Sequence, residues 1–422
     1  MNRQRVLSSR RAFLRTAAGV GLAAVVAPPA GAKVPGANDR IGIGFIGVGG
    51  RGTGHVATCK AMADAGENIA LVAVCDAYGP RLRETAEKFN MKPYRRHQEL
   101  LADQTVDVVL IATPDRNHVP QALDAIRADK DVYCEKPMGH WTQFALSRTF
   151  FRETRERNRV VQIGNQGNSN PLWRKLAELV QKGAIGKPQI TNVGYYRRGD
   201  WGERMNIPDP NAKPGKELDW EAFLGDAPQV PFTPDRFFSW RKYLDYAGGP
   251  CTDLFPHVYT PFVSAINLDI PRFTVANGGI FKYTTYDREV PDTFSMSMDY
   301  DKPTPNTVNL CCTLANDFML PPAIYGDEGT ITLRNVTWEA GCEAINVTPL
   351  GGGKPEVLAG SKGDSTRDHW LDFLKCVRTR GRPVADVEFG YRVQGALCMA
   401  MLSWKERKVA RYDREKQEIV LG

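Results

Sequence analysis

Short apolar segments alternate with segments of helical periodicity along the first half of the chain. Strand-length apolar runs are predicted at residues 40–47, 69–76, 106–112, 131–134 and 160–164. Apolar residues recur at helical spacing at residues 53–65, 80–89, 118–128, 142–158 and 171–182. The run VDVVLIA at 106–112 is apolar without alternation, which is typical of a parallel strand buried on both faces. This order predicts a doubly wound α/β domain over residues 40–166.

The pattern changes after residue 182, where longer strands and more turns are expected. Strands are predicted at residues 190–196, 271–283, 293–300, 307–314 and 330–336, and helices at 366–378 and 391–406. We therefore expect an α+β domain at 167–390 with a large, mostly antiparallel open sheet. Residues 391–422 are expected to form a C-terminal helix and tail that pack back on the body. Residues 199–238, rich in proline, aspartate and aromatic residues, are expected to form a long ordered loop over the cleft.

The first 32 residues have the order of parts found in a twin-arginine export signal. The segment Ser9-Arg10-Arg11-Ala12-Phe13-Leu14 precedes an apolar run at 17–27, and Ala30-Gly31-Ala32 fits a small-x-small cleavage site. The run is too short to span a bilayer permanently, so no stable membrane anchor is expected. The sequence predicts export of the folded protein to the periplasm or beyond. The alternative is a disordered basic tail.

The net charge argues against a polyanionic partner. The whole chain carries a formal charge of +7, but five arginines lie in residues 1–32, and without that segment the charge is +2. This small charge gives no reason to expect nucleic acid as a partner. The nine cysteines contain no CxxC pair and no His/Cys cluster with zinc spacing, so no metal site is predicted.

A glycine pattern at the end of the first predicted strand indicates a dinucleotide site. Gly47-x-Gly49-x-x-Gly52 allows a tight turn, close approach of a diphosphate to the backbone, and close packing of helix on strand. Asp76 ends the second strand, 24 residues after Gly52. A carboxylate there would bind both ribose hydroxyls of NAD and repel the 2′-phosphate of NADP. The alternative is a glycine-rich turn in an ordinary α/β protein.

Polar residues gather where the predicted parallel strands end, which is where ligands bind in such sheets. They are Asp76, Thr113-Pro114, Glu135-Lys136, and Gln162 to Asn165. Lys136 could bind a substrate hydroxyl and ease loss of its proton. Farther along, Asp253 and His257 would share one face if the segment were a single helix, and an imidazole oriented by a carboxylate can accept a hydroxyl proton. The alternatives are a buried core histidine, or two metal ligands without a third.

Several motifs in order resemble one oxidoreductase family. GFIGVGGRG, VAVCD, ATPDRNH, EKP and GGPCTDLFPH match the glucose–fructose oxidoreductase / inositol dehydrogenase / MocA-like (Gfo/Idh/MocA) family, and the stretch DHWLDFLKCVRTRGRPVADVEFGYR is similar to its exported members. The resemblance extends from residue 40 to the C-terminal region. It implies a Rossmann domain, a C-terminal α/β domain whose open sheet often makes dimer or tetramer contacts, and NAD or NADP between the domains.

The resemblance also implies roles for individual residues. The diphosphate would be held at Gly47, Gly49, Gly50, Arg51 and Gly52, and the adenosine ribose at Asp76. The nicotinamide half would be lined by Thr113, Pro114, His118 and Glu135, with Gln162 and Asn165 also meeting cofactor or sugar. Lys136, Asp253 and His257 would form the substrate-binding and proton-transfer set. The chain departs from the family pattern at Asp115, where asparagine is frequent, and at Pro256, just before the histidine.

Together these features predict an NAD-dependent oxidoreductase that acts on a CH–OH group of a sugar or polyol. Arg241 and Tyr246 are expected to contact the substrate, and a homodimer or homotetramer is expected. Because free NAD is not expected to be recycled outside the cytoplasm, an exported member should keep its cofactor bound. Two alternatives remain: a redox-neutral, NAD-dependent glycoside hydrolase, and a catalytically inactive sugar-binding or scaffold protein.

Overall fold

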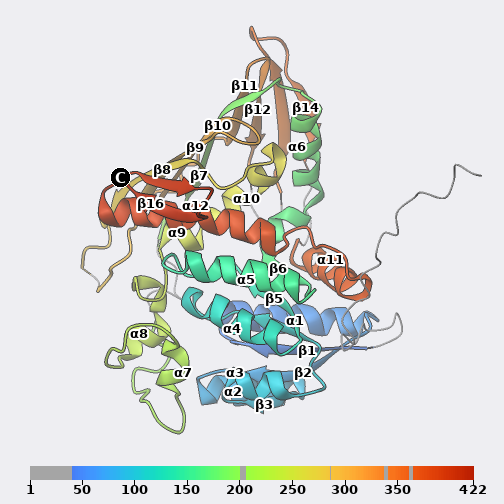
Figure 1. The fold of residues 1–422 in the computed structure, drawn as a ribbon, viewed down its shortest axis with the longest axis vertical. Helices are drawn as coiled ribbons and strands as arrows, with labels where there is room; N and C mark the ends of the chain where they lie inside the picture. Colours follow the sequence, from blue (N-terminus) through green and yellow to red (C-terminus); the bar gives the residue numbers. More distant parts are fainter. Residues whose placement is uncertain (1–39, 200–205, 286, 337–340, 361–364) are drawn as a thin grey trace, which may run out of the picture. The chain divides into compact units, whose positions relative to one another are not determined.

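The computed structural model describes residues 40–199, 206–285, 287–336, 341–360 and 365–422 (Figure 1). The export signal predicted at residues 1–32 lies outside the described residues. The described chain contains a six-stranded and a ten-stranded sheet. This confirms the predicted fold class, a parallel Rossmann sheet followed by a domain with a large, mostly antiparallel sheet.

The first sheet is parallel throughout and has the strand order β3-β2-β1-β4-β5-β6. Its strands are β1 (Ile41–Ile46), β2 (Ile69–Cys75), β3 (Lys92–Tyr94), β4 (Val108–Ile111), β5 (Asp131–Glu135) and β6 (Val161–Gly164). Because strand order reverses between β1 and β4, the carboxyl ends of these strands form the crevice in which such sheets bind ligands. Sequence analysis missed β3, which is three residues long and has no fully buried side chain to mark it.

Helices connect these strands on both faces of the sheet (Figure 1). They are α1 (Gly50–Asp64), α2 (Gly79–Phe89), α3 (His97–Ala102), α4 (Asp115–Arg127) and α5 (Phe144–Glu156), followed by a 3₁₀ turn η1 (Gln166–Ser169) and α6 (Pro171–Gln181). The first helix begins at Gly50, three residues earlier than predicted. Arg51 and Gly52 therefore lie in its first turn rather than in the loop before it.

The second sheet has the order β14-β13-β12-β11-β7-β10-β9-β8-β15-β16, and only β7 and β10 pair in parallel. Its strands are β7 (Pro188–Tyr196), β8 (Phe273–Gly279), β9 (Thr293–Tyr300), β10 (Asn306–Thr313), β11 (Ala323–Gly326), β12 (Gly329–Arg334), β13 (Ala344–Pro349), β14 (Glu356–Ala359), β15 (Ala410–Asp413) and β16 (Glu418–Leu421). Five of them, β11 and β13 to β16, were not predicted. The tail of the chain thus extends the edge of this sheet beside β8.

Two helices from the end of the chain complete the core around the first sheet. Trp370 and Phe373 of α11 (Ser365–Thr379) pack in one apolar cluster with Ile43 and Tyr133 of the sheet. On the other side, α12 (Val387–Glu406) packs against α5 and β6. The Rossmann core therefore includes residues far outside the predicted segment 40–166, and the two domains share buried contacts.

A long segment between β7 and the second domain's first helices forms what we call the strap, residues 206–247. It contains α7 (Trp220–Leu224), α8 (Pro234–Phe238) and a 3₁₀ turn η3 (Trp240–Lys242). Apolar side chains such as Leu218, Phe223 and Phe237 give the strap a small core of its own. After it come the short helix α9 (Pro250–Asp253) and α10 (Phe255–Ile266). The expectation of an ordered segment here agrees with this packing.

Candidate functional site

A cavity of about 850 Å³ opens at the carboxyl ends of β1, β2, β4 and β5. The predicted site residues that line it are Gly47, Gly49, Gly50, Arg51, Asp76, Thr113, Pro114, His118, Glu135, Lys136, Arg241, Asp253 and His257. Most of the residues predicted separately to bind dinucleotide, to transfer a proton and to contact substrate thus face one space. The strap supplies the outer wall.

The glycine turn leaves room for a diphosphate. Gly47 has φ +83°, a conformation that favours glycine, and a Cβ on Gly52 would lie 2.0 Å from the Gly47 carbonyl oxygen. A Cβ on Gly50 would meet nothing within 4 Å. Because the first N–H groups of α1 have no partners within the helix, its N-terminus offers donors to an anion at this opening. These residues fit the diphosphate of a dinucleotide.

Asp76 lies at the end of β2, buried and held by four donors. The Val48 N–H (2.9 Å) and Arg81 Nε (3.1 Å) donate to Oδ2, while the Tyr78 N–H and Arg81 Nη2, both at 2.9 Å, donate to Oδ1. Arg81 also lines the cavity. Sequence analysis did not single out Arg81, because an arginine in the first turn of a helix is common. A ribose that bonds Asp76 must therefore displace part of its contact with Arg81.

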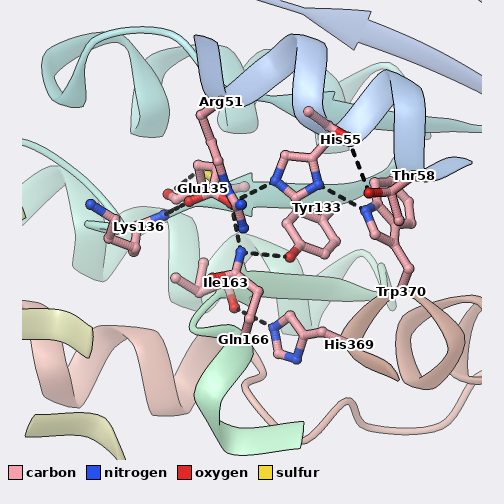
Figure 2. Close-up of polar contacts among 12 residues, drawn as sticks. Arg51, His55, Thr58, Tyr133, Glu135, Lys136, Ile163, Gln166, His369 and Trp370 are labelled. Atoms are coloured by element: carbon pink, nitrogen blue, oxygen red, sulfur yellow. Dashed lines mark hydrogen bonds and ion pairs between the residues drawn. The ribbon is translucent and has the colours of Figure 1, made fainter. Parts of the chain in front are cut away.

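Glu135 lies beneath the cavity at the end of β5, only 3% exposed. Its Oε1 accepts hydrogen bonds from Arg51 Nε (2.9 Å), His55 Nε2 (2.7 Å) and Gln166 Nε2 (2.7 Å) (Figure 2). Burial alone raises the pKa of Glu135, but Arg51 and His55 outweigh it and hold that pKa well below its ordinary value. The side chain is therefore a buried anion that anchors the side chain of Arg51.

Lys136 follows Glu135 and reaches across to the second domain. Its Nζ donates to the backbone carbonyl (2.8 Å) and to Oδ1 (2.9 Å) of Asp253, and Arg241 Nε lies 3.6 Å from the same Oδ1. Asp253 thus holds two cations at the cavity wall. Arg241 also stacks on Trp240, with 4.2 Å between its guanidinium carbon and the ring centre.

Asp253 and His257 share the cavity wall although they lie on different helices. Asp253 ends α9, and α10 begins at Phe255, so the condition of a single helix is not met. Pro256 falls in the first turn of α10, where its missing N–H breaks no helical hydrogen bond. It therefore leaves the placement of His257 intact, and both side chains line the cavity beside Lys136.

Asp115, the departure from the family pattern, begins α4 and faces this set. Its Oδ2 accepts a hydrogen bond from Thr252 Oγ1 at 2.9 Å, and it lines the cavity with Lys136. Burial raises the pKa of Asp115 to about 6, against the opposing effects of Lys136, Thr252 and Arg241. The cavity therefore contains a carboxyl group that can change its charge near neutral pH.

His118 lines the cavity and also braces the loop that follows β5. Its ring lies between the carbonyl oxygens of Pro137 (Nδ1, 2.7 Å) and Thr113 (Nε2, 2.8 Å). Burial lowers the pKa of His118, so a neutral ring donates to one of these oxygens. The residue ties α4 to the strand ends on either side of the site.

Four predicted site residues do not line the cavity: Gly52, which packs against the Gly47 carbonyl behind the turn, and three side chains farther along the chain. Tyr246 is 1% exposed and packs on Phe223 in the core of the strap, so the structure does not support its predicted substrate contact. Gln162 is fully buried and donates to the His369 carbonyl at 2.8 Å. Asn165 lies buried just after β6. These three belong to the packing around the site, because sequence position at a strand end does not determine the direction of a side chain.

Other lining residues were missed or left undecided from the sequence. Those from the strap are Asn206, Pro208, Ala222, Phe223, Phe237, Phe238 and Trp240, and Tyr195 of β7 and Arg197 just after it line the cavity as well. The aromatic and basic residues of the strap indicate a substrate-binding surface, but their positions in the sequence do not determine which side chains face the cavity.

Among the described residues, no His, Cys, Asp and Glu side chains are grouped in a way that could bind a metal ion. In the same part of the chain, none of the helices combines the length and apolar character that crossing a membrane needs. No disulfide occurs among the described residues.

Comparisons with known proteins agree with the geometry. A family model described as oxidoreductase family, NAD-binding Rossmann fold, matches residues 41–165, and one described as oxidoreductase family, C-terminal alpha/beta domain, matches residues 170–270. Together they cover more than half of the chain. The chain is 33% identical to the myo-inositol 2-dehydrogenase of Thermotoga maritima over 152 residues, which are 36% of this chain and 44% of that protein. The match thus spans less than half of that relative.

Solved structures share the fold over most of the chain. A levoglucosan dehydrogenase in complex with NADH and levoglucosan has a TM-score of 0.66 at 18% identity, covering 90% of this chain and 99% of that one. The aldose-aldose oxidoreductase of Caulobacter crescentus, complexed with glycerol, has a TM-score of 0.65 at 17% identity, covering 88% and 99%. At these identities the likeness shows the fold.

The Asp76→Ser substitution is expected to shift the cofactor preference from NAD toward NADP. Serine removes the charge that repels a 2′-phosphate and releases two Arg81 donors toward it. Titration with NADH and NADPH should show that the affinity for NADPH relative to NADH rises about a hundredfold. This corresponds to the free energy of one or two charge-assisted hydrogen bonds. The double variant Asp76→Ser, Arg81→Gln should lose most of this gain. An unchanged ratio in Asp76→Ser would contradict the assignment of the ribose site.

Replacing Asp115 by asparagine should remove a pH dependence of stability. A carboxyl with a folded pKa of about 6 and an unfolded value near 3.9 binds its proton more tightly when folded, so its contribution to stability falls as pH rises through that window. Asparagine keeps an acceptor for Thr252 but cannot ionise. In urea unfolding, the free energy of unfolding of the variant minus that of the natural protein should increase by about 2–3 kcal/mol from pH 4 to pH 7.

The exposed Asp129, at the other end of α4, offers a control for this comparison. Asp129→Asn should change the free energy of unfolding by a similar amount at each pH. If the free energies of unfolding of Asp115→Asn and the natural protein differed by the same amount from pH 4 to pH 7, the raised pKa of Asp115 would be refuted.

Proposed function

The chain belongs to the Gfo/Idh/MocA oxidoreductase family, and on that basis we propose that it oxidises or reduces a CH–OH group of a sugar or polyol with a tightly held NAD. One observation carries the proposal. Lys136 Nζ, bonded to Asp253, faces the same cavity as the glycine turn, Asp76 and His257. A dinucleotide cradle and a proton-transfer set therefore meet in one space.

The residues support a simple division of labour. NAD supplies the acceptor for the hydride that leaves the carbinol carbon. Lys136 donates a hydrogen bond to the carbinol oxygen and stabilises negative charge there, while Asp253 orients Lys136. The His257 imidazole accepts the hydroxyl proton, and the O–H electron pair becomes the second bond of the carbonyl. Arg241 offers hydrogen-bond donors to the rest of a sugar, and Trp240, on which it stacks, offers an aromatic face.

We propose that the strap retains the cofactor. It is attached to the rim of the Rossmann domain directly after Asp76, where Tyr78 pairs with Leu218 and the Gly79 N–H donates to the Glu217 carbonyl at 2.7 Å. Asp219 also donates its N–H to the Ala77 carbonyl at 2.9 Å. A dinucleotide bound at Asp76 would have to pass this attachment to leave.

Side chains reinforce the attachment farther along the rim. Arg96 forms ion pairs with Asp219 (2.9 Å) and Glu221 (3.0 Å), and Arg116 with Asp226 (2.9 Å). The buried Asn117 Nδ2 donates to the Phe223 carbonyl at 2.8 Å. Retention of this kind suits the export expected from residues 1–32, since NAD would be loaded before translocation and reoxidised or reduced in place. We therefore propose a periplasmic or secreted protein with a closed hydride cycle.

A second function also follows from a retained cofactor: redox-neutral glycoside hydrolysis. Oxidation of a hydroxyl acidifies the neighbouring C–H, a base removes that proton as the glycosidic oxygen leaves, and water addition with return of the hydride restores the sugar. His257 could serve as the base, whereas Tyr246 lies in the core of the strap. The presence of Lys136, Asp253 and His257 in one cavity argues against a catalytically inactive scaffold.

We further propose that the chain forms a homodimer or homotetramer through the outer face of the second sheet. Ile190, Val275, Tyr325 and Val357 on this face are 43–58% exposed. Strand register aligns Ile190 with Tyr325, so apolar side chains stand together rather than singly. Light scattering after size-exclusion chromatography measures the assembly.

Turnover assays distinguish the two activities. Protein purified with its cofactor should form NADH with free sugars or polyols if it is a dehydrogenase. Release of nitrophenol from nitrophenyl glycosides without added NAD would favour the hydrolase. Lys136→Ala should lower kcat about 10²–10³-fold in the operative assay, as loss of a charged donor at a reacting oxygen does. Lys182→Ala, at an exposed position after α6, is the matched control, and full turnover by Lys136→Ala would refute the mechanism.

Weakening the strap should speed release of the cofactor. The double variant Arg96→Ala, Arg116→Ala removes three ion pairs between the strap and the rim. At about 0.5 kcal/mol for each exposed pair, NADH dissociation should become about tenfold faster. Stopped-flow fluorescence after mixing with excess NAD measures the rate. Arg127→Ala, Arg155→Ala, which removes ion pairs outside the strap, should leave it unchanged, and equal rates in both variants would contradict retention by the strap.

A further inference from the structure

The buried carboxylate of Glu135 depends on a histidine that none of the predicted roles uses. His55 lies one turn into α1, fully buried, and its Nε2 is 2.7 Å from Glu135 Oε1. Its other ring nitrogen, Nδ1, accepts a hydrogen bond from Trp370 Nε1 at 2.8 Å (Figure 2). Trp370 belongs to α11, which is 315 residues away in the sequence. The ring thus joins the first helix, the strand end beside the cavity, and the C-terminal region.

These two contacts decide the proton on His55. An indole N–H can only donate, so Nδ1 must present its lone pair to Trp370, and the ring proton must lie on Nε2. The Nε2–H then donates to Glu135. Formation of an imidazolium would require breaking the bond with Trp370. Burial also lowers the pKa of His55, opposed by the hydrogen bond to Glu135 and reinforced by Arg51.

The neutral state of His55 matters because Glu135 already has one cationic partner. Arg51 Nε bonds the same oxygen at 2.9 Å, and Arg51 lines the cavity in the first turn of α1. A charged His55 would compete with Arg51 for the buried anion. Glu135 Oε2 in addition accepts the Lys136 N–H at 3.2 Å. One carboxylate therefore sets the positions of a side chain at the diphosphate end and of the backbone that carries Lys136.

We propose that His55 and Trp370 are positioning residues of the dinucleotide site. Trp370 locks His55 as a neutral donor, and His55 with Gln166 fixes the Glu135 carboxylate so that Arg51 stands at the diphosphate. The groups that face His55 are Glu135 and Tyr133 from β5, Arg51 from α1, and His369 and Trp370 from α11. The inference depends on the dinucleotide site and holds for either activity proposed above.

Trp370→Phe tests the lock with little change of shape. Phenylalanine keeps an aromatic ring against Tyr133, on which Trp370 stacks at 4.6 Å, but removes the N–H. Nδ1 can then take a proton as pH falls below the ordinary histidine value of about 6.5. The resulting imidazolium should weaken the hold of Glu135 on Arg51. Trp404→Phe is the matched control, since it also removes one indole hydrogen bond, to the Gly278 carbonyl at 3.1 Å.

The first readout is the release of NADH, followed by its fluorescence after mixing with excess NAD. Relative to the natural protein, Trp370→Phe should release NADH about tenfold faster at pH 5.5 and less than about twofold faster at pH 8, since a charge-assisted hydrogen bond is worth about 1.5 kcal/mol or more. Adding His55→Gln, which keeps one donor and one acceptor but cannot titrate, should abolish this pH dependence. The proposal would be overturned if the release rate of Trp370→Phe relative to the natural protein did not change with pH. It would also be overturned if Trp404→Phe showed the same increase at pH 5.5.

The second readout observes His55 directly in the full-length protein. The chain has six histidines, so ¹⁵N-histidine labelling gives a small set of ring signals, and those of His55 are the ones lost in His55→Gln. In the natural protein they should show Nδ1 without and Nε2 with a proton throughout pH 5.5–8. Titration of His55 in that range would refute the lock even if Trp370→Phe failed to fold. Neither readout uses a sugar, so failure here is distinct from failure of the proposed activity.

Discussion

A carboxylate buried beside the dinucleotide cavity is the constraint around which this part of the molecule is arranged. Removing a charge such as Glu135 from water costs several kcal/mol unless partners compensate for the lost hydration. Compensation comes from three donors on one oxygen, supplied by α1, by the turn after β6, and through His55 by α11. Because two of these donors lie on α1, one lies on η1, and His55 is itself held by α11, Glu135 can be an anion only when those elements are assembled.

Elements that follow residue 166 also pack against the first sheet. Trp370 of α11, near the end of the chain, packs into the Rossmann core. The helix α12 packs against α5 and β6. Lys136 completes the junction by bonding Asp253 across the cavity. The Lys136–Asp253 pair therefore forms from both domains, and its geometry depends on the packing that joins them. The strap closes the remaining side with a small apolar core of its own.

Much of the site could be predicted because its chemistry has short-range sequence signals. The spacing of Gly47, Gly49 and Gly52 reflects backbone geometry at one turn, and Asp76 follows from the length of one strand–helix–strand unit. Lys136 was predicted from its place at the end of a buried strand. Such signals need only local structure. Asp253 and His257 were paired through an assumed single helix, and they face the same cavity although the helix is broken at Leu254.

The sequence by itself determined that the first sheet is a doubly wound parallel sheet, where most of its strands end, and which residues form the glycine turn, since apolar periodicity and backbone sterics act over a few residues. Only the tertiary structure decided which polar side chains at those ends face the cavity. It buried Tyr246 in the strap, placed Gln162 behind the site, and brought Arg81 onto Asp76 and Trp370 onto His55. These side-chain positions depend on contacts between segments that are distant in the sequence. The burial and hydrogen bonding of each side chain depend on how the whole core packs.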